Sequence, residues 1–285
     1  MPLFYNQAQL FYNGNQTASN VTQGERVGVI SAEKNSLNTG FSAGENISYI
    51  INIVNSGLTA LTGLTVTDNL GAMTVSTGAI VPLSYVEGSL LYYVDGELRN
   101  TATATATATE LVISNVDVPA GGSAVIAYQA TVNEYAPVYD NATITNTAEI
   151  AGGGITTAIE VKDTIASTDA PELSITKTIS PERVTENGRI TYSFIITNTG
   201  NTAATVDDAV SVSDVFDPVL TQIDGRLDGD VLTRNTEYTY NEQTGEFAVV
   251  DGVITVPAAT YERNADNVVI TTPGTAILTV SGNIS

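Results

Sequence analysis

The sequence predicts an all-β protein that consists of two tandem β-sandwiches preceded by a short β-hairpin. Three observations lead to this fold class. Apolar and polar residues alternate in short runs, which is the period of a half-buried strand. Val, Ile, Thr and Tyr prevail while Trp is absent, a composition that suits pleated sheets better than helices. The pattern of the first half of the chain also returns in the second half, so both halves are expected to fold on one plan.

The repeat is clearest between residues 31–70 and 174–216. Both copies pass through an Asn-x-Gly triplet that reverses the chain, "NSG" in the first and "NTG" in the second. Further on, "PAGGSAVIAYQATV" at 119–132 corresponds to "PGTAILTVSGNI" at 273–284. The matched positions are Lys34 with Lys177, Gly44 with Gly188, Tyr49 with Tyr192, Asn55 with Asn198, Gly57 with Gly200 and Asp68 with Asp214.

The individual strands follow from alternation and from turn residues. Ile190, Tyr192, Phe194 and Ile196 are expected to share one face of a strand. "TATATATA" at 101–108 has low complexity, yet its period of two fits a strand with a face of small residues. The polar segment "KDTIASTDAPE" at 162–172 contains a proline and is predicted to be the linker. The expected parts are an N-terminal extension at 1–21, one sandwich at 22–165 and a second at 166–285.

Composition also excludes several functions. The formal net charge of −21 disfavours nucleic acid as a partner, because such a surface repels phosphates. The chain has no cysteine and no histidine, so disulfides, the usual zinc sites and histidine-based triads are excluded. The acidic segment at 224–230 lacks the ligand spacing of a calcium loop and is interpreted as a solvated turn. We expect no cofactor, no metal and no enzymatic activity.

The first residues, "MPLFYNQAQL", lack the basic and apolar segments of a secretory signal. No stretch approaches the roughly 20 apolar residues that span a bilayer. Either a signal was removed before this numbering begins, or the chain reaches its destination by another route.

Several of these motifs occur together in one known group of proteins. The early lysine, the "NTG" turn, "VTD" and the closing "TNTAEI" resemble a bacterial and archaeal surface-protein repeat catalogued as a domain of unknown function. The resemblance covers nearly all of both repeats, from about Val27 onward. It implies an immunoglobulin-like sandwich fold and a structural or adhesive role at an extracellular cell or spore surface. It carries no catalytic residues.

The second copy of the pattern stops early. In the first copy, the segment at 124–132 is followed by "ATITNTAEIAGGGITTAIEV", which predicts two strands around a glycine-rich turn. The matching segment at 276–284 is followed only by Ser285. A sandwich without its last two strands would expose core side chains and an unpaired edge.

The N-terminus resembles the two strands that the second copy lacks. "YNQAQLFYNGNQTASNV" predicts a hairpin around an Asn13-Gly14 turn. Aligned with residues 145–161, Asn6 falls on Asn146, Ala8 on Ala148, Leu10 on Ile150, Thr17-Ala18 on Thr157-Ala158 and Val21 on Val161. The hypothesis is head-to-tail polymerisation, in which residues 3–21 of one subunit complete the second sandwich of another. The residues expected to form this joint are Asn6, Ala8, Leu10, Phe11, Thr17 and Val21.

Other interpretations of the N-terminus and of the whole chain remain open from the sequence. The hairpin could fold back on its own subunit or be frayed. The protein could instead be a surface-layer or adhesin protein that binds a carbohydrate or a protein. The surface that it decorates and any host ligand are not specified by the sequence.

Two sets of residues fit the chemistry of an intramolecular isopeptide bond. The first is Lys34, Asp68 and Asn146, and the second is Lys177, Asp214 and Asn6 of a neighbouring subunit. A neutral lysine would attack the asparagine carboxamide while a protonated acid polarises it, and burial favours both neutral forms. The alternative is that the lysines are exposed and that the aspartates and asparagines form turns.

Overall fold

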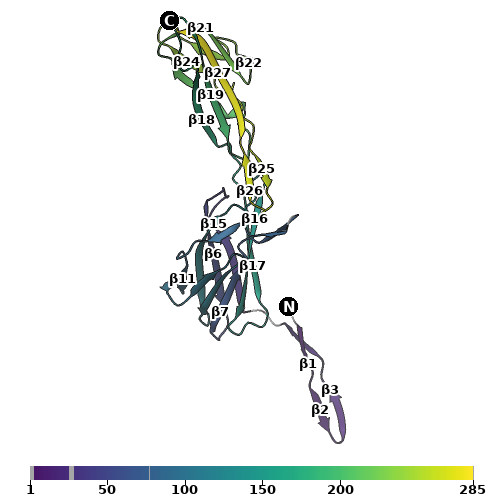
Figure 1. Ribbon diagram of the computed structural model, residues 1–285. Coiled ribbons are helices and arrows are strands. Elements are labelled where there is room, and N and C mark those ends of the chain that lie inside the picture. Colours follow the sequence, from purple (N-terminus) through teal and green to yellow (C-terminus); the bar gives the residue numbers. More distant parts are fainter. Residues whose placement is uncertain (1–2, 26–28, 77, 285) are drawn as a thin grey trace.

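The protein is described by a computed structural model that covers residues 3–25, 29–76 and 78–284. The molecule is elongated, with an N-terminal hairpin at one end, a β-sandwich in the middle and a second sandwich at the other end (Figure 1). These ranges contain strands and one short 3-10 helix, η1 (Val206–Asp208), and no α-helix. None of their helices has the length and apolar character needed to cross a membrane. The all-β prediction is confirmed. Val27, where the family resemblance begins, lies outside the described ranges.

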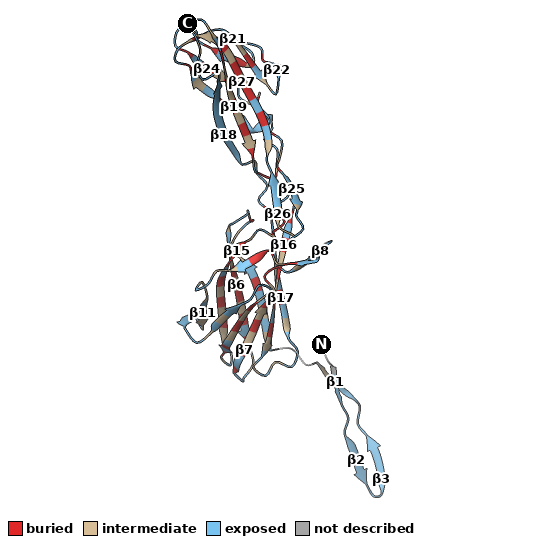
Figure 2. Ribbon diagram, in the orientation of Figure 1, coloured by how far each residue is buried: buried red, intermediate tan, exposed pale blue. Residues whose placement is uncertain are grey.

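The N-terminal hairpin consists of two successive antiparallel pairs. Strand β1 (Leu3–Asn6) pairs with β4 (Thr22–Glu25), and β2 (Gln9–Tyr12) pairs with β3 (Asn15–Ala18). Asn13 and Gly14 both have positive φ angles, as the tight Asn-Gly turn requires. Residues 4–23 are all exposed, so no other described part of the chain covers the hairpin (Figure 2).

The first sandwich packs a six-stranded sheet against a five-stranded sheet. The first sheet contains β5 (Ile30–Ser36), β6 (Asn46–Asn55), β10 (Leu83–Tyr85), β11 (Leu91–Val94), β12 (Glu97–Arg99) and β15 (Ser123–Val132). The second has the order β13 (Thr103–Ala106), β14 (Leu111–Val118), β7 (Leu61–Asp68), β16 (Thr143–Gly152) and β17 (Ile159–Ala166). A small hairpin, β8 (Met73–Val75) with β9 (Gly78–Ile80), projects from it. The predicted strand at 101–108 forms in its central part as β13.

Alternation places the apolar side chains of both sheets in one core. Along β6 every second residue is buried, and the same holds along β15 and β16. The Asn-x-Gly turn is held by a buried side chain: the Asn55 amide donates to the Thr59 carbonyl at 2.8 Å, and its Oδ1 accepts the Gly57 N–H at 3.0 Å. Asn198 makes the same contacts with Thr202 and Gly200 in the second repeat. Both turns confirm the sequence prediction.

The second sandwich has a five-stranded and a three-stranded sheet. The larger sheet runs in the order β18 (Leu173–Ser180), β19 (Arg189–Asn198), β27 (Gly274–Ile284), β21 (Leu220–Leu227) and β22 (Asp230–Val231). The smaller runs in the order β20 (Ser213–Val215), β24 (Glu246–Val249) and β23 (Tyr238–Tyr240). Its core includes Ile190, Phe194 and Ile196, which share one face of β19 as the alternation predicts.

Strand pairing relates the two sandwiches element by element. β18, β19, β20, β24 and β27 occupy the positions of β5, β6, β7, β14 and β15, because the same neighbours pair in the same antiparallel sense. In the first sandwich β16 pairs with the outer edge of β7, and β17 continues the sheet toward β5. Among the described residues no strand of the second sandwich takes either position, so β20 is an edge strand.

The segment between the sandwiches differs from the prediction. Residues 162–166 of the expected linker belong to β17, because Val161 and Ile165 are buried and the segment pairs fully with β16. The connection between strands is therefore residues 167–172. A further hairpin, β25 (Thr260–Arg263) with β26 (Val269–Thr272), contacts the first sandwich through bonds from Arg263 Nη2 to the Tyr135 carbonyl and from the Val269 N–H to the Glu134 carbonyl.

Candidate functional site

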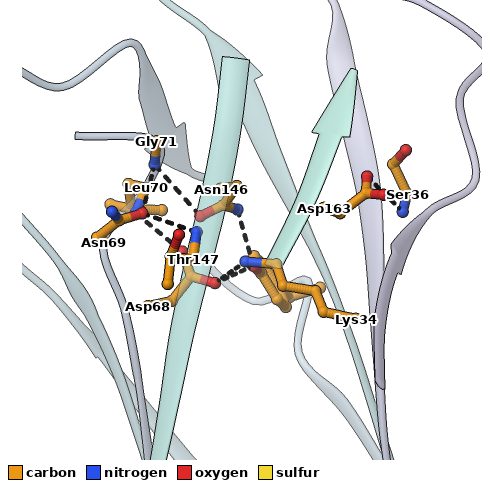
Figure 3. Close-up of polar contacts among 10 residues, drawn as sticks. Lys34, Ser36, Asp68, Asn69, Leu70, Gly71, Asn146, Thr147 and Asp163 are labelled. Carbon is orange, nitrogen blue, oxygen red and sulfur yellow. Dashed lines mark hydrogen bonds and ion pairs between the residues drawn. The ribbon is translucent and has the colours of Figure 1, made fainter. Parts of the chain in front are cut away.

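Lys34, Asp68 and Asn146 meet in the interior of the first sandwich, each supplied by a different strand (Figure 3). Lys34 is on β5, where alternation turns it inward, and it is the one fully buried residue of that strand. Asp68 ends β7, and Asn146 lies on β16. The sequence prediction that these three residues come together is thus supported by their placement on the described strands.

The carboxylate of Asp68 is the centre of this site. It forms an ion pair with Lys34 Nζ, and both side chains have 0% exposure. Its Oδ1 accepts the Leu70 N–H at 2.8 Å, and its Oδ2 accepts the Tyr128 hydroxyl at 2.5 Å. Because each acceptor atom has a donor, the buried charge is fully paired.

The carboxamide of Asn146 is held at both of its polar atoms. Its Nδ2 donates to the Tyr128 hydroxyl at 3.2 Å, and its Oδ1 accepts the Gly71 N–H at 3.2 Å (Figure 3). Gly71 has a φ of 73°, which allows the tight turn after β7 to point its N–H at this oxygen. The amide oxygen therefore faces a fixed hydrogen-bond donor.

Two tyrosine rings enclose the lysine. Tyr49 and Tyr128 stack with their centroids 5.6 Å apart, and Lys34 Nζ lies 4.9 Å and 5.9 Å from those centroids. Burial lowers the pKa of Lys34 although the Asp68 charge opposes that change. Burial and then the Asp68 charge raise the pKa of the Tyr128 hydroxyl. Burial therefore makes the Lys34 amine easier to deprotonate than an exposed lysine and keeps the Tyr128 phenol protonated.

The second set of residues, around Lys177 and Asp214, has a similar arrangement but is partly exposed to solvent. Lys177 forms an ion pair with Asp214, and their side chains are 42% and 19% exposed. Lys177 Nζ lies 4.6 Å from the Tyr192 centroid and 5.6 Å from that of Phe216. No asparagine of the described residues bonds to this pair, since the strand position that Asn146 holds in the first sandwich is vacant beside β20.

The inward face of β18 is exposed as well. Leu173, Ile175 and Ile179 alternate with outward residues, yet they are exposed, Ile175 by 54%. The matching strand β5 is covered, because β17 packs beside it and Asp163 of β17 accepts the Ser36 N–H. Figure 2 shows β18 exposed along its length. Beside β20 and β18, the described residues leave a gap. This gap corresponds to the position that β16 and β17 occupy in the first sandwich.

The residues expected to form the joint are all in the hairpin and are all exposed, Leu10 by 60% and Phe11 by 68%. Asn6 ends β1 and Ala8 directly precedes β2. Leu10 and Phe11 lie in β2, Thr17 lies in β3, and Val21 directly precedes β4. The structure does not bring them to Lys177 or Asp214 of the same chain (Figure 1).

The observed register corrects part of the sequence alignment. Asn6 lies opposite Thr22 as Asn146 lies opposite Asp163. Thr17, however, lies opposite Leu10, and therefore takes the position of Ile159 rather than Thr157, because the Asn-Gly turn is shorter than the glycine-rich turn after β16. Between β3 and β4 the hairpin has three residues, 19–21, whereas the corresponding part of β17 has two, 161–162. Val21 therefore cannot be assigned to Val161 alone.

Sequence reasoning missed Tyr128 and Gly71 as members of the site. An aromatic residue in an alternating strand reads as core, and its hydroxyl partner depends on tertiary packing. The one available signal was that Tyr49 recurs as Tyr192, next to the recurring lysine. Gly71 follows Asp68 in a turn, where a glycine is ordinary.

Comparisons with known proteins yield only distant likeness. No family model matches the chain, and no curated protein matches it. Among solved structures, the chain is similar to the pilus backbone subunit RrgB of Streptococcus pneumoniae, with 13% identity and a TM-score of 0.35 over 82% of this chain and 52% of that one. It thus spans about half the length of that subunit.

Two further solved structures are similar to the chain at a comparably low identity and TM-score. One is the major pilin subunit BcpA of Bacillus cereus, with 10% identity and a TM-score of 0.36 over 98% of this chain and 74% of that one. The other is the collagen-binding domain of a Staphylococcus aureus adhesin, with 10% identity and a TM-score of 0.32 over 50% of this chain and all of that one. The proposals below depend on this chain's own residues.

Proposed function

We propose that the protein is a structural subunit of an extracellular filament, on a bacterial cell or spore surface, that polymerises head to tail. The β1–β4 hairpin of one subunit fills the gap beside β20 and β18 in the next. The observation that carries the proposal is the difference between two copies of one fold. β16 and β17 close the first sandwich, whereas the same place in the second is open, and an exposed hairpin of similar pattern begins the chain.

The two strand pairs of the hairpin, β1 with β4 and β2 with β3, each follow the register in which β16 pairs with β17. Asn6–Thr22 corresponds to Asn146–Asp163, and Leu10–Thr17 corresponds to Ile150–Ile159. The same alternation then turns one face of the hairpin inward. This inward face consists of Phe4, Asn6, Ala8 and Leu10, whose counterparts Ile144, Asn146, Ala148 and Ile150 are all buried.

The first pair of the hairpin also presents a large apolar side chain. In the first sandwich Ile144 lies opposite Ile165, and both are buried. In the hairpin Phe4 lies opposite Gly24, and a Cβ on Gly24 would come within 2.3 Å of the Phe4 ring. One large ring over a glycine can thus occupy much of the space that two isoleucines share in the first sandwich.

The physical basis of the joint is strand addition to an open edge. The backbone of β2 would pair with β20 as the second half of β16 pairs with β7, and the inward side chains would cover the exposed apolar face of β18. Two inserted strands bury on the order of 2,000 Å², which is in the range of permanent interfaces. Because the donor and the acceptor are different surfaces, the contact is heterologous and propagates into a filament.

We further propose that each subunit carries a Lys34–Asn146 isopeptide bond, and that each joint can form a second bond between Lys177 and Asn6 of the donor subunit. Neutral Lys34 Nζ attacks Cγ of Asn146, the Nζ–Cγ bond forms, the Cγ–Nδ2 bond breaks, and ammonia leaves. The lowered pKa of Lys34 and the fixed Gly71 donor at the amide oxygen support this chemistry.

The test compares the full chain with a chain that lacks residues 1–21, using electron microscopy and sedimentation. The full chain should form filaments and the shortened chain should remain monomeric. A synthetic peptide of residues 3–25 should bind the shortened chain, whereas a peptide of the same composition in scrambled order should not. Filaments from the shortened chain would refute the donor role, and a full chain that stays monomeric would favour the adhesin alternative.

A further inference from the structure

The Tyr128 hydroxyl forms hydrogen bonds with both the acid and the amide of the buried site. It donates to Asp68 Oδ2 at 2.5 Å and accepts from Asn146 Nδ2 at 3.2 Å. The hydrogen bonds of the Asp68 side chain with described residues reach Lys34, Leu70 and Tyr128, and none reaches Asn146. The carboxylate is therefore connected to the amide nitrogen through the phenol.

We infer that Tyr128 is a catalytic residue of the cross-linking reaction, the group that delivers a proton to the departing nitrogen of Asn146. This inference rests on the proposed Lys34–Asn146 bond and adds to it a residue that the lysine, acid and asparagine set does not contain.

The proton balance requires such a carrier. When Lys34 Nζ attacks Cγ of Asn146, the new bond leaves a surplus proton on Nζ, while Nδ2 needs one more proton to leave as ammonia. Asp68 Oδ2 is paired with Nζ and can accept the first proton. It then passes a proton to the Tyr128 oxygen as Tyr128 passes its own to Nδ2. One proton moves from Nζ to Nδ2, and both carriers end as they began.

Two further features of the site suit this role. Burial and the Asp68 charge raise the pKa of Tyr128, so the phenol holds its proton until the amide nitrogen becomes basic in the tetrahedral intermediate. The stacking of Tyr128 on Tyr49 fixes the ring, and the hydroxyl therefore points at the two groups without a loss of side-chain freedom during the reaction.

The second sandwich lacks this hydroxyl. Tyr49 pairs with Tyr128, whereas its counterpart Tyr192 pairs with Val280. The ring that stacks on Tyr192 is Phe216, 4.9 Å away, which has no polar atom. The two sites thus share the lysine and the acid but differ in the proton carrier.

The experiment follows bond formation in the full chain made by cell-free synthesis, quenched in acid at intervals and analysed by intact mass. Wild type should lose one ammonia from the first sandwich. Tyr128→Phe keeps the ring and its stacking, and should lower the rate by about 100-fold or more, the usual contribution of general acid–base catalysis. Tyr85→Phe is the matched control, because the Tyr85 ring lies in the same cluster, 6.5 Å from Tyr128, and should react at the wild-type rate.

A second variant distinguishes a loss of catalysis from a folding defect. Fluorotyrosine placed at residue 128 keeps the hydroxyl and its contacts but makes it more acidic, and should change the rate while the circular dichroism stays the same. Equal rates for wild type, Tyr128→Phe and the fluorotyrosine protein would overturn the role of Tyr128. No loss of ammonia in wild type would instead overturn the proposed bond itself, and the inference with it.

Discussion

Lys34 and Asp68 form an ion pair in which neither side chain exposes any surface, at core positions where a sandwich ordinarily has apolar residues. The matching pair, Lys177 with Asp214, is partly exposed because no strand covers it within the described residues. The lysine and the aspartate are thus fully buried in the first sandwich and partly exposed in the second. The two sites should therefore respond differently to the same substitution.

Loss of the acid should affect the two sandwiches unequally. Asp68→Ala would leave the Lys34 amine buried without its partner, and should lower the free energy of unfolding of the first sandwich by about 3–5 kcal/mol. Asp214→Ala is the matched control and should cost about 1 kcal/mol or less before assembly, since that pair is screened by water. Urea unfolding of the unassembled chain, followed by tyrosine fluorescence, measures both. Equal losses would contradict the difference in burial.

The alternation of the hairpin should decide which substitutions block assembly. Leu10→Asp would bring a charge into the core of the neighbouring sandwich, and burial of an unpaired charge costs several kcal/mol, so the joint should weaken by at least about 100-fold. Gln9→Asp adds the same charge to the outward face and should assemble nearly as wild type. Sedimentation over a concentration series measures both. Assembly that is blocked equally by the two variants would contradict the proposed inward face.

The covalent joint should depend on one hairpin residue. Asn6→Ala removes the only carboxamide that the proposed register brings to Lys177, while the strand can still pair. Filaments of this variant should form but dissociate into monomers on boiling in detergent, whereas wild-type filaments should leave a ladder. Asn15→Ala, in β3, is the control and should keep the ladder. A ladder that persists in Asn6→Ala would assign the cross-link to another residue.

Bond formation in the first sandwich should depend on pH through Lys34. Because burial lowers the pKa of Lys34, its neutral fraction becomes large at a pH below the ordinary lysine value of 10.5. The rate of ammonia loss should therefore rise with pH and level off before pH 10.5. Timed intact-mass measurements after folding at several pH values provide the profile. A rate that still rises tenfold per pH unit at 10.5 would contradict a lowered pKa.

The sequence was sufficient for those features that depend on local pattern. Alternation predicted the strands around Ile190 and Phe194, the Asn-x-Gly triplets predicted turns, and the repeat paired Lys34 with Lys177. The linker was wrong at 162–166 because Lys162 and Thr164 are outward residues of β17, and the buried residues, Val161 and Ile165, are too few to stand out.

Features that depend on contacts between distant segments could not be predicted. Tyr128 joins Asp68 across 60 positions of sequence, and only the packed sandwich shows that its hydroxyl reaches the acid. The extra residue between β3 and β4 shifts the hairpin register, which composition does not reveal. The contact of Arg263 with the Tyr135 carbonyl likewise joins parts of the chain that share no sequence pattern.

The central claim is that the hairpin of one subunit lies along β20 of another, and a pair of cysteines tests it most directly. Glu149 lies opposite Thr67 in the first sandwich, so the proposed joint places Gln9 of the donor opposite Ser213 of the acceptor. Because the chain has no cysteine, the Q9C/S213C protein has no thiols besides the two that the proposed joint brings together. On oxidation it should form a ladder of disulfide-linked oligomers in denaturing gels without reductant. A disulfide within single chains, or no disulfide in assembled material, would contradict the claim.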